Sequence, residues 1–216
     1  MKEKLLKGLK WFYKSYIWLG VLLLAIDIIT KQIILHSGLK PNVNDYYNWG
    51  FVHINYVLNQ GAAFGMGTGN EAINRIVYLI IATCISAAII FYLIWKRKET
   101  KLYVRACLIM VVTGAVGNMI DRIFYGPLEG SDGLFSGMVV DWIDFFWFWG
   151  YVFNIADSCI VVAAFMLIIY VIMLEVKDYL AKRKAEEGPK VTLSKTEKER
   201  LEQDDSPEKA SDKESK

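Results

Sequence analysis

Two Asn-Xaa-Xaa-Asp elements stand at the edges of apolar stretches and place polar groups where chemistry could occur. The first holds Asn118 and Asp121 and is followed by Arg122, and the second holds Asn154 and Asp157. Residues three apart lie on one face of a helix, so each element can present an amide and a carboxylate to the same site. Because ionisable groups inside a membrane span are costly, these residues are candidates for a functional site.

A further carboxylate, Asp141, lies between the two elements and supplies a partner for Asp157. Two carboxylates close together cannot both ionise easily, so they share a proton. The ionised member can take a proton from water while the neutral member donates to a carbonyl oxygen, which is acid–base peptide hydrolysis. The alternatives are that each carboxylate only caps a helix or pairs with Arg, and that Asp144, on the same face, replaces Asp141. For Asp121 we favour a structural ion pair with Arg122.

The remaining polar residues have structural interpretations beside functional ones. Asp27 and Lys31 are four residues apart and can pair within one helix, although Lys31 can instead extend to the membrane interface. Asn118 and Asn154 are expected to orient carboxylates or backbone rather than to react. The chain has no His-Glu-x-x-His and no Gly-x-Ser-x-Gly motif, so we expect neither a metal nor a serine nucleophile.

Four apolar stretches are long enough to cross a bilayer as helices. The 216-residue chain is 54% hydrophobic, as expected for a small polytopic membrane protein. We expect the spans at residues 16–35, 73–95, 102–120 and 151–174. Lys and Arg gather before the first span, between the second and third, and after the fourth. This pattern places both termini in the cytoplasm and the loops 36–72 and 121–150 outside.

The expected organisation is a basic cytoplasmic N-terminus (1–15), a membrane domain (16–175) and a charged tail (176–216). The tail has too few apolar residues to fold and is expected to be disordered. Residues 51–58 have a β-like pattern and predict a small outer sheet, and the aromatic segment 138–149 is expected at the membrane interface.

The membrane orientation predicted from Lys and Arg places the polar residues together in the outer half of the membrane. A proton or cation relay through Asp27, Asp121 and Asp157 is the alternative function, and it would need polar groups through the whole membrane depth. No basic patch indicates nucleic acid.

Five segments in this order resemble the bacterial lipoprotein signal peptidases, or type II signal peptidases. They are DIITK at 27–31, NQGAAFG at 59–65, GAVGNMIDR at 114–122, VVDWI at 139–143 and FNIADS at 153–158. Each segment is a weak signal by itself, but five in order together with four spans are specific.

The resemblance implies an α-helical polytopic membrane protein with four transmembrane helices, an extracytoplasmic β-cradle and an interfacial helix. It implies an aspartic endopeptidase of the bacterial cytoplasmic membrane that cuts the signal peptide from diacylglyceryl-modified prolipoproteins. The implied catalytic pair is Asp141 and Asp157. The implied supporting residues are Asp27, Lys31, Asn59, Gly61, Asn118, Asp121, Arg122, Asn154 and Ala156. We expect no metal or cofactor, a monomer, and lipid-modified prolipoproteins and membrane lipids as the partners.

Overall fold

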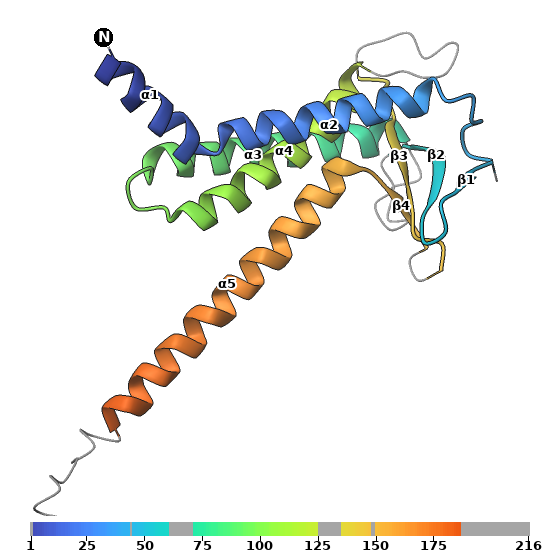
Figure 1. Ribbon diagram of the computed structural model, residues 1–216. Coiled ribbons are helices and arrows are strands. Elements are labelled where there is room, and N and C mark those ends of the chain that lie inside the picture. Colours follow the sequence, from blue (N-terminus) through green and yellow to red (C-terminus); the bar gives the residue numbers. More distant parts are fainter. Residues whose placement is uncertain (1, 44, 61–70, 125–134, 148–149, 187–216) are drawn as a thin grey trace, which may run out of the picture. The chain divides into compact units, whose positions relative to one another are not determined.

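The computed structural model describes residues 2–43, 45–60, 71–124, 135–147 and 150–186 (Figure 1). The chain divides into two compact units, Met1–Tyr170 and Val171–Lys216, and the boundary falls within the last helix. The site described below lies within the first unit.

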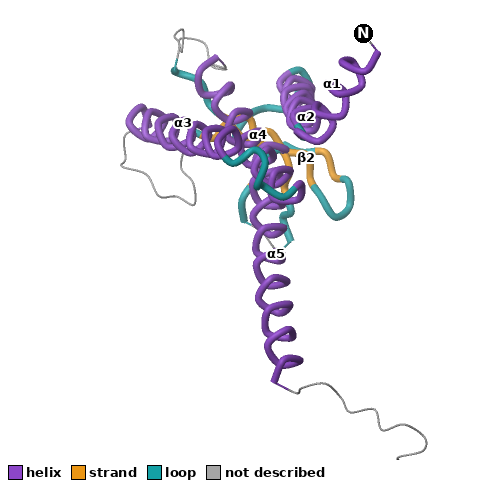
Figure 2. The backbone as a smooth tube through the Cα atoms, turned by 90° about the vertical axis from the view of Figure 1, so that its left-hand side faces the viewer, coloured by secondary structure: helices purple, strands orange, loops and turns teal. Residues whose placement is uncertain are grey.

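Helices make up most of the described chain (Figure 2). The short helix α1 (Lys2–Ser15) precedes four longer ones, α2 (Ile17–Leu35), α3 (Glu71–Trp95), α4 (Leu102–Phe124) and α5 (Ile155–Glu186). These four are long and apolar enough to cross a membrane. The four predicted spans are therefore confirmed, with α4 and α5 longer than expected at their C-terminal ends. Helix α5 begins at Ile155 rather than at residue 151, because residues 152–153 form a strand.

The helices α2 and α4 lie side by side and form the base of the site (Figure 1). A Cβ added at Gly20 of α2 would lie 2.9 Å from both Ile109 Cγ2 and Thr113 Oγ1 of α4. Small residues at such contacts allow the backbones of membrane helices to approach closely. The close approach brings polar side chains of the two helices within hydrogen-bonding distance of each other.

A four-stranded antiparallel sheet stands at the C-terminal end of α2. Its strands, in spatial and chain order, are β1 (Tyr47–Asn48), β2 (His53–Asn59), β3 (Val139–Asp144) and β4 (Val152–Phe153). Alternate side chains of β2 are buried, as expected for a strand with one covered face. The predicted small sheet is confirmed, and β3, from the loop between α4 and α5, also belongs to it. The location of the sheet outside the membrane stays a prediction.

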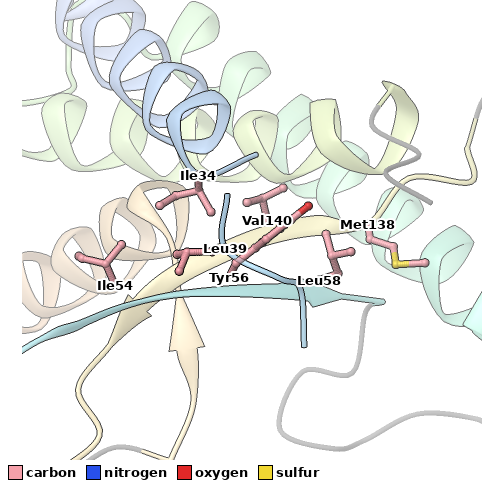
Figure 3. Packing of buried hydrophobic residues seen from close by; sticks show 7 residues of the cluster. All are labelled: Ile34, Leu39, Ile54, Tyr56, Leu58, Met138 and Val140. Carbon is pink, nitrogen blue, oxygen red and sulfur yellow. The ribbon is translucent and has the colours of Figure 1, made fainter. Parts of the chain in front are cut away.

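A small apolar core fixes the sheet onto the end of α2. The residues Ile34, Leu39, Ile54, Tyr56, Leu58, Met138 and Val140 form this core (Figure 3). Burial of their side chains is the main force that holds the sheet in place. Since β3 carries Asp141, the core also fixes the position of that carboxylate.

Helix α5 continues to Glu186, so the expectation that residues 176–186 belong to a disordered tail is wrong. The Lys, Glu and Ala residues of that segment are good helix formers. Residues 187–216 lie outside the described chain.

The expected interfacial helix is not found in residues 36–43, 45–60 and 135–147, none of which is helical. Residues 61–70 and 125–134, in the rest of the expected outer loops, lie outside the described chain, so this helix stays a prediction.

Candidate active site

The N-terminus of α5 is closed by a reciprocal pair of hydrogen bonds between Asn154 and Asp157. The Asp157 backbone N–H donates to Asn154 Oδ1 at 3.0 Å, and the Asn154 backbone N–H donates to Asp157 Oδ2 at 3.2 Å. This arrangement is a capping box. The other carboxylate oxygen, Asp157 Oδ1, accepts a bond of 2.6 Å from Asn118 Nδ2. Asp157 therefore caps its helix and also faces the polar cluster.

Asn154 connects the two candidate catalytic carboxylates through its side-chain amide and its backbone N–H. Its Nδ2 donates to Asp141 Oδ1 at 2.7 Å and to Asn118 Oδ1 at 3.0 Å. Asn154 is completely buried, and both protons of its amide are used. One buried residue thus holds Asp141 with its side chain and Asp157 with its backbone.

The pairing of β2 with β3 places Asp141 in this cluster. Asp141 lies opposite Val57, is 1% exposed, and accepts a bond of 2.9 Å from Asn59 Nδ2 through its Oδ2. Burial, together with the negative charge of Asp157, raises the pKa of the Asp141 carboxyl to about 8. This environment favours the protonated form of the carboxyl.

Asp144 lies three residues from Asp141 on the same strand. Successive side chains of a strand point to opposite faces, so Asp141 and Asp144 do not share a face. The expectation that they do is wrong, because it assumed a helical spacing for this segment. Asp144 is therefore removed as an alternative to Asp141 in this cluster.

A buried ammonium group, that of Lys31, is the only described cation with an ion pair to the carboxylates of this site. Lys31 Nζ lies 2.8 Å from Asp27 Oδ2, 2.8 Å from Asp121 Oδ2 and 3.2 Å from Asn118 Oδ1. The three N–H groups of the ammonium thus have three acceptor oxygens. The pairing of Asp27 with Lys31 is confirmed. The expected pair between Asp121 and Arg122 is wrong, since the ion pair of Asp121 is with Lys31.

The two carboxylates paired with Lys31 also hold the elements that carry the candidate catalytic pair. Asp27 Oδ1 accepts a bond of 2.9 Å from the Ala156 backbone N–H in the first turn of α5. Asp121 Oδ2 accepts a bond of 3.2 Å from the Val140 backbone N–H of β3. A carboxylate at a helix N-terminus also interacts favourably with the helix dipole. Asp27 and Asp121 therefore position α5 and β3 relative to each other.

The remaining predicted residues are placed less centrally. Arg122 Nη1 donates to the Asn118 carbonyl at 3.1 Å, and its guanidinium lies 5.6 Å from the ring centre of Tyr78 on α3. Gly61 falls outside the described residues. The contact with Tyr78 was not predicted, because a lone Tyr in an apolar span carries no sequence signal for it.

Gly117 leaves room for this arrangement, and a methyl group there is expected to destabilise it. A Cβ at Gly117 would lie 2.6 Å from Asp27 Oδ2 and 3.0 Å from Ala156 Cβ. We expect Gly117→Ala to lower the free energy of unfolding by about 1–3 kcal/mol, a usual cost of overpacking. Thermal unfolding in detergent measures the effect. Gly150→Ala, where a Cβ meets no atom within 4 Å, is the control and should unfold like the wild type.

Comparisons with known proteins place the chain in a family. The family model described as "Signal peptidase (SPase) II" matches residues 19–173. The lipoprotein signal peptidase of Clostridioides difficile (strain 630) is 34% identical over 163 residues, which are 76% of this chain and 98% of that protein. The lipoprotein signal peptidase of Caldanaerobacter subterraneus subsp. tengcongensis is 40% identical over 146 residues, which are 66% of this chain and 85% of that protein.

Two solved structures, each described as a bacterial membrane enzyme studied by the in meso method, have a similar fold. The structure at 2.3 Å resolution has a TM-score of 0.58 at 27% identity, over 74% of this chain and 88% of that chain. The structure at 1.9 Å has a TM-score of 0.57 at 28% identity, over 73% and 92%. With the family model covering most of the four-helix region, these matches identify the chain as a bacterial membrane enzyme that belongs to the signal peptidase II family.

Proposed function

We propose that Asp141 and Asp157 are the catalytic pair of this signal peptidase and that they cleave the signal peptide from diacylglyceryl-modified prolipoproteins. The observation that carries the proposal is the double role of Asn154, which donates hydrogen bonds to both carboxylates. The cluster also separates two kinds of carboxylate. Asp27 and Asp121 are neutralised by Lys31, whereas Asp141 and Asp157 have no ion pair among the described residues.

In the proposed reaction the pair shares one proton, because two close carboxylates cannot both ionise easily. The ionised member takes a proton from a water molecule, whose oxygen attacks the carbonyl carbon of the scissile peptide bond. The protonated member donates its proton to the carbonyl oxygen. As the C–N bond of the tetrahedral intermediate breaks, the Asp that took the proton from water gives it to the leaving nitrogen. The other Asp takes back a proton from one hydroxyl of the intermediate, so the pair again holds one proton.

The position of the cluster agrees with a substrate whose cleavage site lies at the outer membrane surface. The polar residues lie toward the C-terminal ends of α2 and α4 and at the N-terminus of α5. With both termini in the cytoplasm, as the Lys and Arg distribution predicts, these ends all face outward. A relay across the membrane would need similar groups at the other ends of the helices. We therefore favour hydrolysis next to a lipid-modified Cys over ion transport.

The rate of cleavage is expected to fall as the pH rises through about 8. The ordinary pKa of an Asp carboxyl is 3.8, and that of Asp141 is raised to about 8 by burial and by Asp157. The pair therefore keeps its shared proton below about pH 8 and loses it above, and with the proton it loses the acid that the reaction needs. The measurement is kcat for a lipidated precursor against pH. A rate that stays level far above pH 8 would contradict the shared proton.

Cleavage of a lipidated prolipoprotein by the full chain in lipid nanodiscs tests the proposed function. We expect cleavage immediately before the lipid-modified Cys, at the same rate with and without a chelator. A precursor in which that Cys is replaced by Ser, and which carries no lipid, is the matched control and should be cut far more slowly. Loss of activity on chelation would contradict the metal-free mechanism, and equal cleavage of both precursors would contradict the proposed substrate class.

A further inference from the structure

Helix α1 has an apolar side that the rest of the first unit leaves uncovered. Leu5, Leu6, Phe12 and Tyr13 are 65%, 48%, 44% and 69% exposed. At 3.6 residues per turn these four positions share one side of the helix. Apart from the ring of Tyr13, which stacks on Trp18 of α2, this apolar side is left exposed by the described parts of α2 and α4, on which α1 packs.

The opposite side of α1 is basic. The helix contains five Lys residues and a single Glu. Helical periodicity places positions 4, 7 and 14, all Lys, away from the apolar side. An amphipathic helix with Lys on its polar side and Leu and aromatic residues on the other is the pattern of a helix that lies in a membrane surface.

The junction of α1 with α2 fixes the level at which α1 meets the bilayer. Tyr16 has a left-handed backbone (φ 59°), which ends α1 and starts α2 in a new direction (Figure 1). The rings of Tyr13 and Tyr16 each stack on Trp18, and Trp18 Nε1 donates to the Tyr13 carbonyl at 3.1 Å. Tyr and Trp are enriched at the membrane–water interface, so this aromatic group places the junction there.

A second basic segment lies beside the C-terminal end of α1. Arg105 Nη1 donates to the Lys14 carbonyl at 3.0 Å, and Arg105 also binds carbonyl groups of the α3–α4 loop. That loop contributes the exposed residues Arg97, Lys98 and Lys101. Residues 2–16 and 96–105 together hold ten Lys and Arg residues and two Glu residues. The charge of this end of the unit is complementary to an anionic surface.

We infer that α1 lies in the membrane surface, with Leu5, Leu6 and Phe12 among the acyl chains, Tyr13 at the membrane–water interface and Lys residues on anionic phospholipid headgroups. The apolar side accounts for insertion and the basic side for the choice of lipid. The α3–α4 loop, held to α1 by Arg105, extends the same headgroup-binding surface. This role is separate from the candidate active site, which lies at the opposite ends of α2 and α4.

Hydrogen exchange of the full chain in nanodiscs tests the inference, with discs of neutral phosphatidylcholine compared with discs that also contain phosphatidylglycerol. We expect the α1 amides to exchange at least about tenfold more slowly in the anionic discs. The variant K4Q/K7Q/K14Q should lose this difference. The matched control K177Q/K182Q/K184Q removes as much charge from α5 and should keep it.

A second variant, L5S/F12S, tests the insertion of the apolar side. Both side chains are exposed, so the substitutions should leave the fold intact. We expect faster exchange of the α1 amides in both kinds of disc. Equal exchange of the wild-type α1 in neutral and anionic discs would overturn the inference. So would protection that rises with the number of protein copies per disc, because a second copy would then cover the apolar side.

Discussion

Replacement of either carboxylate of the proposed pair, by Asp141→Asn or Asp157→Asn, should lower the rate of cleavage of a lipidated precursor by about 10⁴-fold or more. An amide can neither take a proton from water nor supply the acid that protonates the carbonyl oxygen. Asn has nearly the same shape as Asp, so the local packing should be kept. Initial rates in nanodiscs, with each variant at the same protein concentration, measure the effect.

Asp144→Asn is the matched control for this prediction. It makes the same chemical change on the same strand, three residues away, on the face opposite to Asp141. Its rate should stay close to that of the wild type. A near-normal rate in Asp141→Asn or Asp157→Asn would remove that residue from the pair. Thermal unfolding of all three variants separates a loss of chemistry from a loss of folding.

The largest effect on stability is expected at Lys31. Its side chain is 2% exposed, and its ammonium group pairs with Asp27 and Asp121 at 2.8 Å each. Lys31→Met keeps the length of the side chain but leaves two buried carboxylates without a cation. Removing one partner of a buried ion pair costs about 3–5 kcal/mol, because an uncompensated buried charge remains. Thermal or denaturant unfolding in detergent should show a loss of that size.

An exposed ion pair gives the matched control for Lys31. Lys96 pairs with Glu99 at 2.8 Å, with side chains 34% and 70% exposed. Water solvates both groups when the pair is broken, so Lys96→Met should cost less than about 1 kcal/mol. If Lys31→Met cost no more than Lys96→Met, Lys31 would not be the charge that neutralises Asp27 and Asp121. Adding Asp27→Asn and Asp121→Asn to Lys31→Met should recover part of the lost stability.

The sequence predicted the helices well because each is a long run of apolar residues, and apolar length is a local property. Strand β2 was predicted for a similar reason, since its alternating pattern is local. The candidate pair Asp141 and Asp157 followed from the cost of placing carboxylates near a membrane and from a family resemblance. The structure adds the contacts of these residues with Asn59, Asn118 and Asn154.

The two errors within the site share one physical cause, which is that neighbours in sequence were taken as neighbours in space. Asp121 was paired with Arg122, but the packing of α4 against α2 places Lys31, ninety residues earlier, beside Asp121 instead. Asp144 was placed beside Asp141 by helical spacing, although the segment is a strand held by its pairing with β2. Such contacts depend on how separate elements pack, and no local pattern encodes them.

The central claim is that Asp141 and Asp157 act as one unit around a shared proton. The most direct test is the single-turnover rate of cleavage of a lipidated precursor by the double variant Asp141→Asn/Asp157→Asn, compared with each single variant. Residues that act as one unit give strongly non-additive effects. The double variant is expected to be no slower than the slower single variant. Rate losses that multiply in the double variant would show that Asp141 and Asp157 have independent roles and would overturn the shared-proton pair.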